Sequence, residues 1–334
     1  MNQTSESEAT TDRVVGNLAD NAFAVYAVVN IPFYTFVVGV LIRHRKALNT
    51  PFYAICISAG AADILMSFYN LLTMAAVLVR FGDWYRKSEV WATWSNSGNW
   101  YLYTVQVYGV LLLSFNRFTA LCVPLKHQKI WHKKRLTACV FVQWLIPTAY
   151  VWPMLFPIGR SHFDDNNVAV FSNPEVHTLY FAVDLTLEYG VYAPTLVCLY
   201  VVMFVTAWRQ SRKLKANTVS LKRHVNEVEK RTRRLQLKNL RLDVKLATCG
   251  ALLCVFYFVT ISTYVFFAMG KSYGWVMRLF AYSSYLFTTL NPWFLLLFSN
   301  SARQCFWGTL TGGGTQQGVQ RAAIAGNKRR INRW

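Results

Sequence analysis

Leu252–Thr260 reads LLCVFYFVT, and Trp293–Phe298 reads WFLLLF. Both stretches are apolar on every side of a helix, without the polar stripe that a helix on a soluble protein turns toward water. A helix of this kind is buried either in a large soluble core or in a bilayer. Seven apolar stretches in one chain leave too little amphipathic sequence to surround a soluble core. We therefore expect a membrane-embedded helix bundle.

The hydrocarbon core of a bilayer is about 30 Å thick, which corresponds to about 20 apolar residues at a rise of about 1.5 Å per residue. Seven stretches of the sequence reach that length. They comprise residues 22–42, 51–79, 98–123, 136–158, 179–207, 246–269 and 276–299. The predicted fold class is an all-α membrane protein, a seven-transmembrane helix bundle. It is flanked by an N-terminal tail over residues 1–21 and a C-terminal tail over residues 300–334.

The composition supports the membrane class and argues against a soluble one. Only 15% of the residues are charged and 54% are hydrophobic, whereas a soluble domain carries about 25% charged residues. The net charge of +20 would suggest a nucleic-acid-binding protein if the chain were hydrophilic. The hydrophobicity, and the tethering of the basic segments between membrane spans, argue against nucleic acid as a partner.

The basic residues are distributed unequally between alternate connecting segments. Segments 43–50, 124–135, 208–245 and 300–334 together hold 27 Lys and Arg, whereas the N-terminal tail and the other three loops hold six. Loops that remain in the cytoplasm carry an excess of Lys and Arg. The sequence therefore predicts an extracellular N-terminus and a cytoplasmic C-terminus, with a net charge of +24 on the cytoplasmic segments and −3 on the outer ones.

The predicted outer tail begins with Asn2-Gln3-Thr4, which is a glycosylation sequon. Asn2 is therefore the predicted site of glycosylation. Residues 1–21 are polar and acidic and contain no apolar region, so we expect no cleavable signal peptide before the first span.

The cysteines indicate neither an outer disulfide nor a metal site. None of the seven lies in a predicted outer segment, and none has the Cys or His spacing of a zinc site. We expect no metal, no cofactor and no catalytic residues, because HExxH and Ser/His arrangements are absent as well. Cys305 follows the seventh span next to Phe306 and Trp307. It is a candidate for palmitoylation on a short interfacial helix, or else an unmodified interfacial thiol.

Polar residues at three points of the apolar spans are candidates for conformational coupling. Arg117 lies near the inner end of the third span, where a charge is expensive unless it is paired or hydrated. It either anchors the span or changes its partner when the bundle opens. Asp63 lies in the middle of the second span, and Asn291-Pro292 interrupts the seventh. Pro292 removes a backbone donor, and Asn291 can bond the freed groups. Together they suggest a polar interior network.

The order of these features resembles that of G-protein-coupled receptors. The segment from Asn116 to Trp131, NRFTALCVPLKHQKIW, is more specific. It resembles the corresponding segment of the nematode serpentine chemoreceptors of the Srg superfamily, Srg or Srv class. The resemblance implies a receptor in the plasma membrane of a sensory neuron, in its cilium, that acts through a heterotrimeric G protein.

The chain departs from the rhodopsin-like pattern at several positions. Asn116 replaces the acid before Arg117, and Phe118 replaces the tyrosine after it. The sixth span has no proline and no CWxP motif, and the usual tyrosine after Asn291-Pro292 is missing. The resemblance assigns activation and G-protein coupling to Asp63, Asn116, Arg117, Asn291 and Pro292, although the usual switch cannot operate in the same way.

An external small-molecule or peptide ligand is expected to enter between the outer halves of the spans. Asp184 and Glu188 lie four residues apart on the fifth span, hence on one helix face. They would repel each other, and could bind a cationic ligand, sense external pH, pair with Arg278 or line a hydrated vestibule without a ligand. Aromatic residues that could line the same cavity, or else form an interfacial belt, are Trp100, Tyr101, Tyr103, Tyr282 and Tyr285.

The basic segment 208–245 has two compatible interpretations. It could be a docking surface for a G protein, or a polybasic stretch held on anionic inner-leaflet lipids at about 1 kcal/mol per basic residue. The leading hypothesis is a chemosensory receptor. The alternative is a transporter or channel that uses Asp63, Asp184 and Glu188 as a relay, although the chain shows neither repeated halves nor clearly discontinuous helices. The sequence leaves the oligomeric state open.

Overall fold

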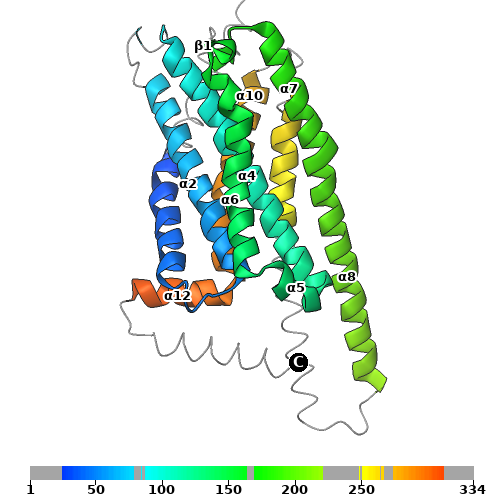
Figure 1. The fold of residues 1–334 in the computed structure, drawn as a ribbon. Coiled ribbons are helices and arrows are strands. Elements are labelled where there is room, and N and C mark those ends of the chain that lie inside the picture. Colours follow the sequence, from blue (N-terminus) through cyan, green and yellow to red (C-terminus); the bar gives the residue numbers. More distant parts are fainter. Residues whose placement is uncertain are drawn as a thin grey trace, which may run out of the picture.

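The computed structural model describes residues 25–78, 84, 87–163, 169–220, 248, 250–263, 265–266 and 274–311. These residues form a bundle of roughly parallel and antiparallel helices (Figure 1). A β-hairpin closes one end of the bundle, and α5 (Pro124–Ile130) and α12 (Asn300–Leu310) lie at the other. Asn2 and most of the basic segment 208–245 lie outside the described residues.

Five described helices are long and apolar enough to cross a bilayer: Val25–Arg43, Pro51–Leu72, Glu89–Cys122, Lys133–Leu155 and Pro174–Arg212. The second of these belongs to α2 (Pro51–Leu78), and the third is α4 (Glu89–Cys122). A shorter apolar helix, Gly250–Thr263, follows in the sixth predicted span. The pair α10 (Gly274–Thr289) and α11 (Asn291–Phe298) occupies the seventh.

Two helices have ends that differ from those expected. α4 begins nine residues before the predicted start at residue 98, because Ser88 caps it by accepting a hydrogen bond from the Trp91 amide. Its first turns carry polar residues that hydropathy alone excludes from a span. α6 (Lys133–Val151) ends early because Pro153 and Pro157 turn the chain into two short 3-10 helices, η1 (Trp152–Leu155) and η2 (Pro157–Gly159).

The fifth span is interrupted by a π-helix. α7 (Pro174–Leu187) leads into η3 (Glu188–Tyr192), and α8 (Ala193–Ser220) follows. The amide of Ala193 donates to the Glu188 carbonyl five residues earlier. Pro194 has no amide proton and its ring crowds the preceding turn, so a widened turn just before it relieves the conflict.

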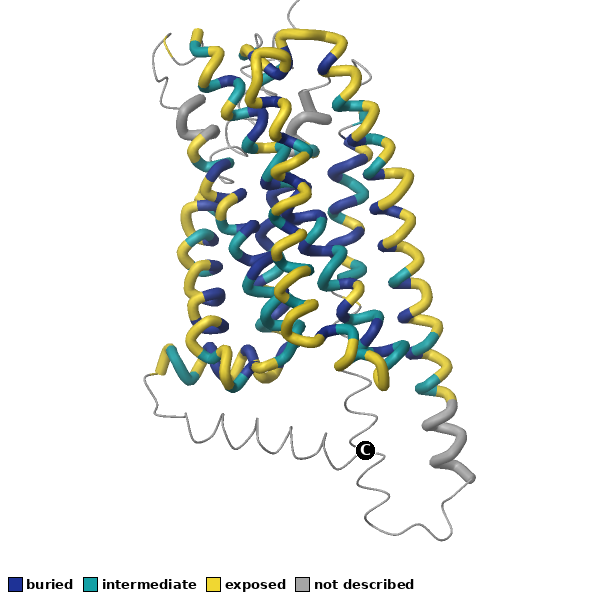
Figure 2. The backbone as a smooth tube through the Cα atoms, viewed as in Figure 1, coloured by how far each residue is buried: buried dark blue, intermediate teal, exposed yellow. Residues whose placement is uncertain are grey.

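The surface of the bundle is the reverse of that of a soluble protein. Figure 2 shows buried positions concentrated on the faces that helices turn toward one another, whereas the outer faces are exposed. Many exposed side chains are large and apolar, among them Phe141 at 62%, Leu179 at 61% and Val201 at 54% exposure. An apolar surface of this extent requires a lipid environment rather than water.

α12 lies across the end of the bundle that also carries α5 (Figure 1). Its side chains Ala302, Cys305 and Phe306 pack against Val37, Val40 and Leu41 of the first helix. Cys305 is only 1% exposed, and burial raises the pKa of its thiol. The thiol thus lies on the side of α12 that packs against the bundle, and palmitoylation of Cys305 stays a prediction. The exposed apolar side chains of α12 are Trp307 and Leu310.

The hairpin consists of β1 (Ser161–Phe163) and β2 (Ala169–Phe171), which pair antiparallel. It is attached to the first turns of α4 without a disulfide. Asn96 Nδ2 donates to Ser161 Oγ at 3.0 Å, and the Ser161 amide donates to Thr93 Oγ1 at 3.0 Å. An exposed ion pair between Arg160 and Glu89 at 3.7 Å lies beside these bonds.

Candidate functional site

Asp63 is the hub of a buried hydrogen-bond network. Its Oδ2 atom accepts from Tyr34 Oη at 2.5 Å and from Asn291 Nδ2 at 2.7 Å, and its Oδ1 atom accepts from Gln106 Nε2 at 2.8 Å. Gln106 Nε2 also lies 3.3 Å from Thr288 Oγ1. The network around the carboxylate therefore joins the first helix, α2, α4 and α11, and reaches α10 through Gln106. Three donors to the carboxylate offset the loss of hydration that burial imposes.

Asn291 can reach Asp63 because the seventh span breaks between α10 and α11. Leu290 ends the α10 hydrogen-bond ladder, and Pro292 occupies the first turn of α11, where no amide donor is required. The sequence placed Asp63 and Asn291 at similar depth, and the structure brings them into contact. It did not indicate Tyr34, Gln106 or Thr288. Only Gln106 offered a signal in the sequence, as a polar residue inside an apolar span.

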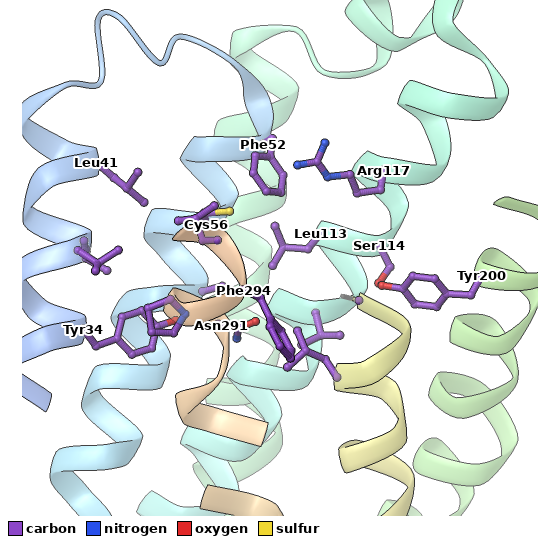
Figure 3. A pocket seen from close by; sticks show the side chains of 18 residues that line it. Tyr34, Leu41, Phe52, Cys56, Leu113, Ser114, Arg117, Tyr200, Asn291 and Phe294 are labelled. Carbon is purple, nitrogen blue, oxygen red and sulfur yellow. The ribbon is translucent and has the colours of Figure 1, made fainter. Parts of the chain in front are cut away.

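Arg117 lies beside Phe52 of α2, with its guanidinium carbon 3.5 Å from the ring centroid (Figure 3). This cation–π contact places the charge over an aromatic face at the α12 end of the bundle. The neighbouring Ser114, one turn earlier on α4, shares a 2.8 Å hydrogen bond with Tyr200 of α8. The Tyr200 side chain fills the space next to Gly250, so that position has no room for a side chain.

A cavity with about 750 Å³ of empty space, part of it open to solvent, adjoins both groups. Its walls come from the first helix, α2, α4, α8, the Gly250–Thr263 helix and α11, and the polar side chains among them are few (Figure 3). Those that line it include Tyr34, Ser114, Arg117, Tyr200 and Asn291. The cavity therefore extends from the Asp63 network, through Tyr34 and Asn291, to Arg117.

The segment that resembles the serpentine chemoreceptors folds as a local unit. Thr119 Oγ1 accepts from Trp131 Nε1 at 2.8 Å and lies 3.0 Å from His127 Nδ1. These contacts hold α5 against the end of α4. Asn116 is buried, and its Nδ2 atom has no hydrogen-bond partner within the described residues. It lies outside the cavity lining, next to Arg117 in sequence.

Asp184 and Glu188 are buried in the other half of the bundle, at 7% and 3% exposure. They lie one helical turn apart at the end of α7, since the Glu188 amide donates to the Asp184 carbonyl. Tyr257 of the Gly250–Thr263 helix donates its hydroxyl to the Glu188 carboxylate. The side chain of Arg278, a possible partner, lies outside the described residues.

The predicted aromatic residues occupy several places. Trp100 donates to Asn96 Oδ1 at 3.0 Å and packs edge-on against Tyr180 of α7, within an apolar cluster below the hairpin. Tyr103 packs against two apolar clusters of the bundle, and Tyr282 lies half-buried on α10. The sequence did not indicate Tyr257 or Tyr192, because tyrosines are frequent in this chain.

The described residues contain no group of three or more His, Cys, Asp or Glu side chains arranged to hold a metal ion. The candidate functional site consists of three parts. These are the Asp63 network, the cavity that ends at Arg117, and the acid pair of Asp184 and Glu188.

The amino-acid sequence is similar to those of several known receptors. Serpentine receptor class V-1 of Caenorhabditis elegans is 31% identical over 147 residues, which is 42% of this chain and 46% of that receptor. A D(2)-like dopamine receptor of Takifugu rubripes is 22% identical over 56% of this chain and 39% of its own length. The matched regions thus span under half the length of these two relatives.

Trace amine-associated receptor 13c of Danio rerio matches more of the bundle, at 24% identity over 77% of this chain and 75% of its own length. These relatives are named as receptors, which favours the receptor hypothesis over the transporter. The family model described as serpentine type 7TM GPCR chemoreceptor Srv matches residues 23–312. This confirms the predicted seven-transmembrane class and narrows the predicted superfamily to one class. The chain belongs to the Srv family of serpentine chemoreceptors.

Proposed function

We propose that this protein is a chemosensory receptor that detects an external small molecule and passes the signal to a heterotrimeric G protein. The observation that carries the proposal is the cavity, whose walls come from six parts of the bundle and which joins the Asp63 network to Arg117. A helix movement in the half of the bundle next to the hairpin changes the shape of this cavity, because packed helices move as units. The family and the names of the relatives support the same function.

The hairpin end is the outer end in this proposal, and the end with α5 and α12 faces the cytoplasm. The charge distribution supports that orientation, since 27 Lys and Arg fall in the segments assigned to the cytoplasm. The receptor would reside in the plasma membrane, in the cilium of a sensory neuron by analogy with its family. Glycosylation of Asn2 belongs to this proposal too, since the orientation places Asn2 outside.

The cytoplasmic surface would consist of α5, the α12 end of α4 and the basic segment 208–245. Thr119, His127 and Trp131 hold α5 at a fixed angle to α4, next to Arg117. We assign to Arg117 a change of partner during activation, from the Phe52 ring to a group of the G protein. The exposed Trp307 and Leu310 of α12, together with the basic segment, would contact anionic inner-leaflet lipids.

The test is a second-messenger assay in cells that express the full chain with a G protein and are exposed to a panel of water-soluble and volatile compounds. We expect a compound-dependent response that Arg117→Ala reduces at least about tenfold, the effect of about 1.4 kcal/mol of lost coupling. The matched control is Lys133→Ala, which removes an exposed basic residue at the start of α6.

Surface labelling of an N-terminal tag in intact cells controls for expression and sidedness. A protein at the cell surface that activates no G protein in response to any compound would contradict the proposed function. An unchanged response in Arg117→Ala would contradict the role of Arg117 and leave the receptor function standing.

A further inference from the structure

The three buried acids of the membrane spans differ in how their charge is compensated. Asp63 accepts hydrogen bonds from three side chains. Glu188 accepts one, from Tyr257. Asp184 is only 7% exposed. It accepts no hydrogen bond from a side chain and forms no ion pair within the part of the chain that the structure describes. The outer half of the bundle therefore contains an acid that has no hydrogen-bond or ion-pair partner among the described residues.

Asp184 is not an isolated group at the helix surface. It lies close enough to Glu188 and Tyr192 for direct electrostatic interaction. The π-helix η3 begins at Glu188 and changes the direction in which the following side chains leave the helix, so that Glu188 and Tyr192 are both buried. Turns of this kind are frequent at functional sites.

Tyrosines lie next to the acid pair. Tyr257 reaches Glu188 from the Gly250–Thr263 helix, and Tyr192 Oη donates to Tyr108 Oη of α4 at 3.1 Å. The Tyr108 and Tyr192 rings meet edge to face, with centroids 5.6 Å apart. Three elements thus contribute tyrosines to this region: Tyr257 contacts Glu188 directly, and Tyr108 contacts Tyr192. Aromatic faces and carboxylates together are the groups that recognise organic ammonium ions.

Two carboxylates one helical turn apart repel each other strongly in a medium of low dielectric constant. A single tyrosine hydroxyl compensates little of that repulsion, and it contacts Glu188 rather than Asp184. A positive charge that enters from outside would satisfy Asp184 and relieve the repulsion in one step. A neutral ligand can donate a hydrogen bond to Asp184 but leaves the repulsion between the carboxylates unrelieved, and an anionic ligand adds to it.

We propose that the ligand is an organic amine in its ammonium form, with its nitrogen bound to the carboxylates of Asp184 and Glu188 and its carbon skeleton against Tyr108, Tyr192 and Tyr257. This inference rests on the proposed receptor function and specifies its ligand class. The amine donates hydrogen bonds to Asp184, which has no donor among the described residues, and shares Glu188 with Tyr257.

The position of this site also provides a route to the cavity. Tyr192 precedes α8, and Tyr200 lies about two turns further along that helix, where it bonds Ser114 next to Arg117 on α4. An amine that draws α7, η3 and the Gly250–Thr263 helix together would move α8 and, through Tyr200, the wall of the cavity. Binding at the outer end and the inner cavity are thereby connected by one helix.

The experiment measures binding to the purified full chain in lipid nanodiscs, with tyramine and phenethylamine as probes and their N-acetyl derivatives as neutral controls. Acetylation keeps the ring and chain but removes the charge. We expect the amines to raise the thermal unfolding temperature and the N-acetyl compounds to leave it unchanged. Asp184→Asn should weaken amine binding about 10- to 100-fold, the value of one charged hydrogen bond.

Glu188→Gln should weaken it less, since Tyr257 already contacts that carboxylate. Glu175→Gln is the matched control, because Glu175 is an exposed acid on the same helix, α7. The thermal unfolding temperature of each variant without a probe shows whether it is folded.

Several outcomes would overturn the inference. These are equal effects of amines and N-acetyl derivatives, no effect of either amine on the unfolding temperature, unchanged binding in Asp184→Asn, or the same stabilisation by sodium chloride alone. Amine binding without any G-protein response would contradict the proposed function and leave the site standing. A G-protein response to neutral compounds that Asp184→Asn does not alter would do the reverse.

Discussion

The bundle contains two buried acidic regions that solve the same physical problem in opposite ways. Around Asp63, hydroxyl and amide groups from three other parts of the chain donate to one carboxylate, so both of its oxygens have donors within the protein. Around Asp184 and Glu188, Tyr257 donates to Glu188 alone, and no donor to Asp184 lies among the described residues. A carboxylate with several protein donors stabilises and connects helices, whereas one with few donors is poised to accept a donor from outside. In the proposed function, the first region transmits a signal and the second receives it.

The largest expected effect comes from breaking the network around Asp63. Asp63→Ala would leave Tyr34, Gln106 and Asn291 with buried donors that have lost their acceptor, at about 3 kcal/mol or more in the free energy of unfolding. Thermal unfolding in nanodiscs, compared with Glu175→Ala on the exposed face of α7, measures it. A variant as stable as the control would mean that Asp63 does not hold these helices together.

The second effect has the opposite sign. Asp184→Asn removes a buried charge that has no partner in the described protein, so we expect the ligand-free receptor to gain about 1 kcal/mol in the free energy of unfolding. The same thermal measurement applies, without any amine present. A loss of stability as large as that of Asp63→Ala would show that Asp184 is satisfied within the protein, and the contrast between the two regions would disappear.

The smallest effect compares single donors of the two regions. Gln106→Leu removes one of three donors to Asp63, and Tyr257→Phe removes the one described donor to Glu188. A net hydrogen bond is worth about 1 kcal/mol, and more to a charged group. We expect Tyr257→Phe to lower the free energy of unfolding by up to about 1 kcal/mol, and Gln106→Leu to lower it less. Equal losses would indicate that the two carboxylates have similar surroundings.

The fold class could be predicted because each span is long and apolar on all sides, a property of local sequence. Its fine structure could not. The early start of α4 depends on a cap at Ser88, and the π-helix at Glu188 depends on how Pro194 is accommodated in the packed bundle. Hydropathy measures neither. The burial of Cys305 on α12 likewise could not be predicted, because the apolar side of a short helix can face either the protein or the lipid.

The candidate site was predictable only where a residue was unusual for its place. Asp63 and Asn291 stood out as polar groups inside apolar spans, as did Asp184 and Glu188. Tyr34, Tyr192 and Tyr257 did not, because tyrosine is common both in membrane interfaces and in cores. Their roles follow from which helix faces meet.

By itself, the sequence of this protein determined a seven-helix membrane chain, its chemoreceptor family and the polar residues that its spans carry. These properties depend on the length, hydrophobicity and order of segments, which are written along the chain. Only the tertiary structure decided that three helices donate to Asp63 and that Asp184 has no donor among the described residues. The compensation of a buried charge depends on atoms that are far apart in sequence and meet only when the bundle has packed.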